Sequence, residues 1–409
     1  MSCPWVGASI DGIAHRLELS TRFHGIILYG ELLEPEYPSV NVTLSNVTAT
    51  DVVVKMANMK SFERPWNATG MLGVGLVSSA QHVWPFLGDK VDAVLKYHGM
   101  NFENGEANAT FEKISQDMKV SWSESMNNVH DFYYKRKTSF TLHNASVCGV
   151  SLTKPASSYW STYIDFQSPC LVLPQEFYNT LLAWAPLQYN TSANITQLKE
   201  GTQLTDLPAI TFQTGFDSPV FSLSLASLVL ANTTSTTPQL CIQKAESIIN
   251  LVLEHQIVLE EDDIFTKELG GISYVPNMYQ SPIVLGAMAV QHLDLYISDY
   301  NKQIGFGHIN PSIVVLTSKD FIYVVVNTSS KCNVPVTCTG EQQYIKRLNL
   351  CKDPDCGQRY YRTLDYTTKT CDVSAIWQWL AFAIITVFVV IEIYVERVKS
   401  RLADRILSE

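Results

Sequence analysis

Few residues of this sequence stand at spacings that catalysis or metal binding would need. The densest group of carboxylates is Glu260, Glu261, Asp262 and Asp263. A calcium loop needs oxygen ligands at alternate positions and a central glycine, which this run lacks, so a solvated acidic loop is favoured over a calcium site. The nine histidines form no His-x-x-x-His pair, and no Cys-x-x-Cys pair or Gly-x-Ser-x-Gly elbow occurs. We therefore expect no metal and no cofactor.

An uncharged, mostly apolar run extends over 19 residues from Val373 to Ile391. About 20 apolar residues, at about 1.5 Å each, span the hydrocarbon core of a membrane. We therefore predict one transmembrane helix over 373–395. Positive charge marks the cytosolic side. Four basic residues follow the run: Arg397, Lys399, Arg401 and Arg405. They predict a type I topology, with residues 1–372 luminal or extracellular and 396–409 as a cytosolic tail.

Sequons for N-glycosylation support this orientation, because all of them precede the apolar run. They begin at Asn41, Asn46, Asn67, Asn108, Asn144, Asn190, Asn194, Asn232 and Asn327. Nine sequons on one side of a span predict a membrane glycoprotein of the secretory pathway or cell surface. The first twenty residues lack the basic and apolar regions of a signal peptide, so we expect the true start to lie upstream of Met1.

Composition limits the class of protein further. With 46% hydrophobic and 17% charged residues, the chain can bury a large core, which excludes a disordered protein. The net charge of −10 makes nucleic acid an unlikely partner. From Leu17 to Leu350, short runs rich in β-branched and aromatic residues predict a mainly β chain. Two helices are expected, over Asp89–Gly99 and over Gln175–Trp184, the second after Pro174.

The segment 317–372 is rich in cysteine and lies between the β-rich part and the span. Its cysteines are Cys332, Cys338, Cys351, Cys356 and Cys371. In an oxidising compartment they predict a juxtamembrane stalk held by disulfides. Because five is an odd number, at least one should pair with the β-rich body or with another chain.

Four segments carry a resemblance when taken in order. They are Gly70–Gly75, Tyr163–Phe177, Leu207–Phe212, and Ile283–Gly286 with Asp299–Gly307. Together they resemble the pepsin-like aspartic proteases, and in layout the membrane-anchored members such as the β-secretases. The resemblance covers about residues 15–312 of the sequence. It implies a mainly β, bilobal pepsin-like fold, in which Gly73 and Gly286 close the two lobes.

The resemblance also implies a division of the chain. Residues 1–130 would form an incomplete N-terminal lobe and 131–316 the C-terminal lobe. Proteases of this family use two aspartates in contact, of which one keeps a proton because like charges so close cannot both ionise. The ionised one activates water and the protonated one donates to the scissile carbonyl. In this sequence Asp165 matches the second of these aspartates.

The turns depart from the family pattern. Phe166 and Gln167, followed by Ser168, replace the hydroxyl residue and the glycine after the second aspartate. Residues 1–72 contain no Asp-Thr/Ser-Gly, so the first turn is expected upstream of Met1. Phe23 would stand at the tyrosine of the flap. Asp165 is then the one surviving candidate for the catalytic pair.

The resemblance also assigns two cysteines of the body. Cys148 matches the position that membrane-anchored members tie to the segment near the membrane, which supplies a partner for one stalk cysteine. Cys241 matches a disulfide position whose usual partner before Leu207 is missing. It is therefore expected to pair with the stalk or to stay free.

Three functions follow from these expectations. The favoured one is a membrane glycoprotein with a catalytically degenerate pepsin-like ectodomain, a pseudoprotease whose cleft binds an extended peptide or whose surface serves assembly. The first alternative is an active membrane-anchored aspartic endopeptidase whose first aspartate lies upstream of Met1. The second alternative is an unrelated β-rich receptor or adhesion glycoprotein.

Overall fold

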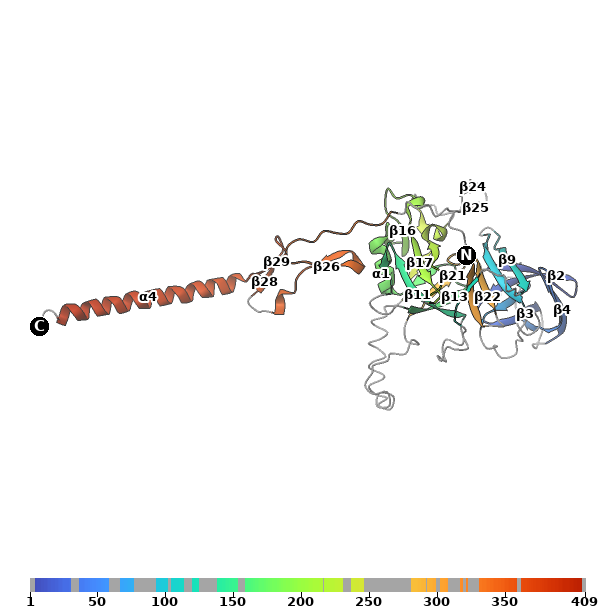
Figure 1. Ribbon diagram of the computed structural model, residues 1–409, viewed down its shortest axis with the longest axis horizontal. Coiled ribbons are helices and arrows are strands. Elements are labelled where there is room, and N and C mark those ends of the chain that lie inside the picture. The colour runs from blue at the N-terminus through green and yellow to red at the C-terminus, as the bar shows by residue number, and fades with distance from the viewer. Residues whose placement is uncertain are drawn as a thin grey trace, which may run out of the picture. The chain divides into compact units, whose positions relative to one another are not determined.

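The computed structural model (Figure 1) describes the chain in two compact units, Met1–Asn333 and Val334–Glu409. The described residues are 4–30, 37–58, 67–76, 93–101, 104–113, 120–124, 138–153, 159–215, 217–230, 237–245, 281–291, 293–298, 302–307, 317–318, 321–322, 331–358 and 362–406. The acidic run Glu260–Asp263, the sequons at Asn232 and Asn327, and the expected lobe boundary near residue 130 lie outside them. Those expectations remain predictions.

A seven-stranded sheet forms the N-terminal part, in the order β5-β4-β1-β2-β7-β3-β6. Alternate side chains point into the core, as Leu17 and Leu19 of β2 do with no exposed surface. The strands are β1 (Trp5–Ile10), β2 (Ile13–Ser20), β3 (His24–Gly30), β4 (Ser39–Leu44), β5 (Val47–Val53), β6 (Lys55–Asn58) and β7 (Gly70–Val74).

A second sheet repeats this arrangement further along the chain, in the order β18-β17-β11-β13-β21-β14-β20, with β12 paired to β11. Its strands are β11 (Ser139–Val147), β12 (Val150–Ser151), β13 (Tyr159–Asp165), β14 (Leu171–Leu173), β17 (Ala209–Gln213), β18 (Phe221–Ser224), β20 (Ile242–Lys244) and β21 (Ile283–Gly286). The Leu207–Phe212 and Ile283–Gly286 segments singled out in the sequence therefore both end in strands of this sheet.

A third sheet joins strands that are far apart in the sequence of the first unit, in the order β10-β23-β22-β8-β9. It contains β8 (Ala93–Met100), β9 (Ala107–Lys113), β10 (Val120–Trp122), β22 (Leu295–Ser298) and β23 (Gln303–Gly307). The predicted helix over Asp89–Gly99 is wrong, because its described part forms β8. Ala93, Leu95 and Tyr97 are buried at every second position, and β9 and β22 satisfy the backbone on both sides.

The predicted helix over Gln175–Trp184 is confirmed as α1, with the same bounds and with Pro174 before it. Its buried face presents Phe177, Leu181 and Trp184, spaced four and three residues apart. Nearby lie β15 (Leu187–Asn190), β16 (Ile195–Leu198) and β19 (Gln239–Leu240). Short elements complete the unit: the 3-10 turns η5 (Leu204–Asp206) and η6 (Leu225–Leu228), with β24 (Thr317–Ser318) and β25 (Phe321–Ile322).

The second unit consists of two disulfide-bonded hairpins and one long helix. Cys338 pairs with Cys351, and Cys356 pairs with Cys371. The elements are β26 (Gln343–Ile345), η8 (Lys346–Leu348), β27 (Leu350–Lys352), η9 (Cys356–Gln358), β28 (Arg362–Asp365), β29 (Thr370–Val373) and α4 (Ala375–Ile406). The disulfides of the predicted stalk are thus confirmed within this unit.

Helix α4 is long and apolar enough to cross a membrane. Its candidate span, Ala375–Leu402, has a mean hydropathy of 2.1 over its most apolar window, none of which is buried in the chain. The helix begins two residues after the predicted start at 373 and continues to Ile406 through most of the predicted tail. The chain therefore carries one candidate transmembrane helix in its described part, near its C-terminal end.

Two further disulfides lie in the first unit. Cys148 pairs with Cys332, which confirms that one cysteine of the predicted stalk is tied to the body. Cys241 pairs with Cys170, so the expectation that Cys241 is free or bound to the stalk is wrong. Parallel pairing of β14 with β20 brings the two cysteines together, because each directly precedes one of these strands.

Residues 331–333 are attached to the body by three consecutive side chains. The Lys331 ammonium donates to Asp206 at 3.1 Å, Cys332 forms the disulfide, and the Asn333 amide donates to the carbonyls of Ala183 and Ala185 at 2.9 and 2.8 Å. A Gln203 backbone N–H and then Lys331 hold the pKa of Asp206 below its usual value. Asn333 thus satisfies carbonyls at the end of α1, whose last turn has no basic residue.

This attachment predicts that Asn333→Ala lowers the free energy of unfolding by about 1–2 kcal/mol, the usual contribution of one or two hydrogen bonds. The matched variant Asn333→Asp should be at least as destabilising, because a carboxylate cannot donate and lies at the negative end of a helix. Urea unfolding of the full chain in detergent measures both. A stable Asn333→Asp chain would show that the amide does not hold α1.

Candidate functional site

The site forms where two parallel strand pairs end. Strand β2 pairs in parallel with β7, and the register places Ser20 opposite Gly73. Strand β13 pairs in parallel with β21, and the register places Asp165 opposite Gly286. The strands that follow also correspond, since β3 pairs with β7 and β6, and β14 pairs with β21 and β20. By this internal repeat, Ser20 is the counterpart of Asp165.

The two glycines are needed because each turn folds back over its partner strand. A Cβ on Gly73 would lie 2.6 Å from the carbonyl oxygen of Phe23, and a Cβ on Gly286 would lie 2.4 Å from that of Ser168. Phe23 and Ser168 each stand three residues after the counterpart positions. Neither approach leaves room for a side chain, so both glycines permit the close contact of turn and strand.

The local hydrogen bonds of the two turns also match. The Oγ of Ser20 accepts the backbone N–H of Arg22 at 3.2 Å, and the Oδ1 of Asp165 accepts that of Gln167 at 3.1 Å. In each turn a side-chain oxygen accepts the N–H two residues on, a common way for short polar side chains to hold a turn. Ser20 therefore performs the local structural role of Asp165 without a carboxylate.

The first turn and Phe23 lie elsewhere in the structure than the sequence resemblance implied. The counterpart of the Asp165 turn is Ser20–Thr21–Arg22, within the sequence rather than upstream of Met1. Phe23 follows directly and lies between β2 and β3, which are not paired with each other because β7 lies between them. Phe23 is therefore part of this turn and not the tip of a flap hairpin.

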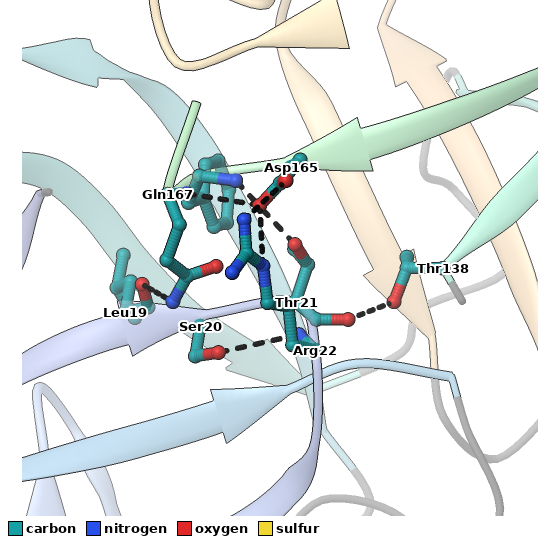
Figure 2. A network of polar contacts seen from close by, with 8 residues as sticks. Leu19, Ser20, Thr21, Arg22, Thr138, Asp165 and Gln167 are labelled. Carbon is teal, nitrogen blue, oxygen red and sulfur yellow. Dashed lines mark hydrogen bonds and ion pairs between the residues drawn. The ribbon is translucent and has the colours of Figure 1, made fainter. Parts of the chain in front are cut away.

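Arg22 of the first turn binds Asp165 of the second, as Figure 2 shows. Its Nε donates to Oδ1 at 3.3 Å and its terminal nitrogen to Oδ2 at 2.8 Å. The contact thus uses both carboxylate oxygens, the arrangement that the planar guanidinium favours. The Asp165 side chain is 21% exposed and that of Arg22 63% exposed, so solvent screens the pair in part.

Two neutral contacts join the same two turns, and a third holds the first turn to Thr138. The backbone N–H of Phe166 reaches the Thr21 hydroxyl at 3.4 Å, and the Gln167 amide donates to the carbonyl of Leu19 at 3.4 Å. The Thr138 hydroxyl donates to the carbonyl of Thr21 at 2.7 Å and is buried. Figure 2 shows these groups around the ion pair, so Arg22–Asp165 is one contact within a polar network.

Phe166 fills the space beneath its turn. Its side chain is 1% exposed, and its ring centroid lies 4.7 Å from that of Tyr97 on β8. Burial raises the pKa of the Tyr97 phenol above its usual value. The residue that replaces the hydroxyl of the family pattern thus packs as a core aromatic against the third sheet.

The chemical capacity of the site follows from the partners of Asp165. Among the described residues, its polar contacts are with the Arg22 guanidinium and the Gln167 N–H. No second carboxylate is among these contacts, and Ser20 stands at the counterpart position. The described residues also form no cluster of three or more metal-ligating side chains. The geometry therefore offers a carboxylate–guanidinium pair between two turns.

Comparison with solved structures assigns the fold. The crystal structure of aspartic proteinase from Irpex lacteus superimposes with a TM-score of 0.51 at 10% sequence identity, covering 80% of this chain and 96% of that one. The first unit therefore has the pepsin-like aspartic proteinase fold, as the four sequence segments predicted. This fold is not that of an unrelated β-rich ectodomain, and it carries no information on a receptor or adhesion role. No protein-family model matches the sequence, and no curated protein does.

The described sequons lie at the surface. The side chains of Asn41, Asn46, Asn67, Asn108, Asn144 and Asn194 are exposed, and Asn190 is half-buried. The Oδ1 of Asn190 accepts the backbone N–H groups of Ser192 and Ala193 at 3.0 and 3.1 Å. Six of these sequons thus present an accessible asparagine, whereas Asn190 is engaged in its own turn.

The ion pair predicts energetic coupling between the two turns. In a double-mutant cycle of Arg22→Ala, Asp165→Ala and the double variant, the coupling energy should be about 1 kcal/mol, because the pair is partly exposed but contacts at two points. Arg22→Lys should recover only part of it, since an ammonium cannot bind both oxygens in the same way. Urea unfolding of full-length variants measures the cycle. Additive single effects would contradict the contact.

Proposed function

We propose that this chain is a membrane-anchored glycoprotein whose pepsin-like domain does not catalyse peptide hydrolysis and acts in binding or assembly. The observation that carries the proposal is the Arg22–Asp165 contact at 2.8 Å, at the place where the two turns meet. Such a domain presents a folded surface or a peptide-binding region while its acidic residue serves structure.

The chemistry of aspartic proteases explains the weight of this observation. Two carboxylates in contact share a proton because they repel when both are ionised, and this gives one base and one acid for the same reaction. Ser20 has no carboxylate, and the Arg22 guanidinium stays protonated at acid and neutral pH, so it cannot act as a proton donor to the substrate. Asp165 beside Arg22 therefore lacks the partner that would donate a proton to a scissile carbonyl.

The alternative of an active endopeptidase rests on Asp165 alone. It would require a second carboxylate to displace Arg22 from Asp165, and Phe166 and Gln167 to be compatible with the active geometry. The Gln167 amide donates to the carbonyl of Leu19, and the Phe166 ring packs against Tyr97. Both residues that differ from the family pattern therefore make contacts that stabilise this fold. These contacts favour the non-catalytic role.

Helix α4 and the sequons support the cellular setting of the proposal. The helix provides one candidate span, and basic residues follow its apolar part at Arg397, Lys399 and Arg401. Four disulfides in the described residues suit an oxidising compartment. These features favour a luminal or extracellular first unit and a cytosolic C-terminus.

The proposal predicts that the wild-type chain does not hydrolyse an unfolded protein substrate at acid pH. Its residual turnover should equal that of Asp165→Asn, because removing the charge of Asp165 removes no catalytic group. Release of acid-soluble peptides measures this. Hydrolysis by the wild type that Asp165→Asn abolishes would contradict the proposal and support the endopeptidase.

A variant with a second carboxylate tests whether the two turns are equivalent. Ser20→Asp with Arg22→Gly puts a carboxylate at the counterpart of Asp165 and removes the guanidinium. If the two turns are equivalent, the carboxylates should titrate as a coupled pair with separated apparent pKa values. Independent titration of the two groups would show that Ser20 does not face Asp165.

The topology is predicted to be type I. In microsomes that contain the full chain, added protease should remove the basic tail and leave residues 1–372 protected and glycosylated. Treatment with an N-glycosidase should lower the apparent mass, and Asn→Gln at the exposed sequons should remove that shift stepwise. A protected tail with an accessible first unit would reverse the orientation.

A further inference from the structure

Helix α4 carries one charged residue within its apolar part. From Ala375 to Ile391 the helix contains no charge, and Glu392 follows. Ile393, Tyr394 and Val395 then continue the apolar stretch before Glu396 and Arg397. At about 1.5 Å per residue, Glu392 lies about 6 Å, one helical turn, inside the cluster of mixed charges. Since about 20 residues span the hydrocarbon core, Glu392, the twentieth residue from Val373, lies at the cytosolic end of that region when the helix spans a membrane.

Two other polar side chains of this stretch are satisfied by the chain itself. The Thr386 hydroxyl donates to the carbonyl of Phe382 at 2.8 Å, and the Gln378 amide donates to that of Val373 at 3.0 Å. Glu392 has no such bond among the described residues. The side chains three and four positions away, which are its neighbours on a helix, are Phe388, Val389, Val395 and Glu396.

These neighbours make the carboxylate costly in a membrane. Three are apolar, and Glu396 has the same charge, so no residue one turn away in α4 supplies a counter-ion. Arg397 is five positions on and leaves from a different side of the helix. Ionisable residues within a span usually pair with a group of another helix or line a polar cavity.

Charge complementarity decides between two occupants of this helix face. A second copy of α4 in parallel would place Glu392 opposite Glu392, which repels unless the two carboxylates share a proton. A different helix with Lys or Arg at the same depth neutralises the charge directly. Apolar side chains of Ile385, Phe388 and Val389 lie on the same side as Glu392 and would pack against that helix.

We propose that the Ile385–Phe388–Val389–Glu392 face of α4 binds a partner transmembrane helix that carries a Lys or Arg about one turn inside its cytosolic boundary. The proposal rests on the membrane anchoring stated under the proposed function. It identifies the partner by a basic residue within its span. The pairing is then an assembly contact in the membrane, separate from the Arg22–Asp165 contact in the first unit.

The test uses the full chain reconstituted in phosphatidylcholine vesicles with a synthetic leucine-rich transmembrane peptide. One peptide has a single Arg at the depth of Glu392, and the matched peptide has Leu there. Energy transfer between labelled chain and peptide measures association. The Arg peptide should bind about tenfold more tightly than the Leu peptide. Glu392→Gln should abolish this difference, and Glu396→Gln should preserve it.

Each outcome bears on one part of the proposal. Equal binding of the two peptides, or a preference that survives Glu392→Gln, overturns it. Self-association of the wild type that Glu392→Gln removes assigns the face to a second copy and also overturns it. Extraction of the chain from the vesicles by alkaline carbonate contradicts the membrane anchor itself, and with it the proposed function.

Discussion

Two turns of the chain meet in the first unit, and the ion pair between Arg22 and Asp165 joins them. Each turn is fixed by a parallel strand pair and by a glycine that admits its backbone. A substitution where the two turns meet therefore affects both strand pairs, β2–β7 and β13–β21. Phe166 contacts Thr21 of the other turn, and Gln167 contacts Leu19 beside it. The Phe166 ring also packs against Tyr97, so neither turn can move without the other.

The substitutions in these turns are consistent with one another. Ser20 keeps the local hydrogen bond that an aspartate would make, Arg22 neutralises the remaining carboxylate, and Phe166 adds a buried aromatic. Burying a phenylalanine contributes about 1.5–3 kcal/mol, more than one partly exposed ion pair provides. The side chains at these positions thus contribute packing and charge compensation.

Much of the fold was predictable from the sequence, because its strand patterns and local motifs still match those of pepsin-like proteins at 10% sequence identity. The segments around Gly73, Asp165, Leu207 and Gly286 kept their order, and α1 kept its start after Pro174. The strand β8 was mistaken for a helix, because its alternation of buried residues becomes clear only with its partner strands. Pairing of Cys170 with Cys241 likewise depends on strands that are distant in the sequence.

The site itself was only half predictable. Asp165 could be found because it matches the family pattern, whereas Ser20–Thr21–Arg22 contains neither the aspartate nor the glycine of that pattern. The remaining signal was a strand with leucines at Leu17 and Leu19 that ends in two hydroxyl residues, together with a later strand at Gly70–Val74 that contains two glycines. That signal is weak without the register of β2 and β7. The contact of Arg22 with Asp165, 143 positions apart, required the fold.

A crystal structure of the full chain in detergent tests this account most directly, by the electron density around Asp165. We predict that the Arg22 guanidinium contacts both carboxylate oxygens and that the Ser20 hydroxyl accepts the backbone N–H of Arg22. A second carboxylate facing Asp165, with Arg22 turned away, would contradict it and restore the catalytic pair.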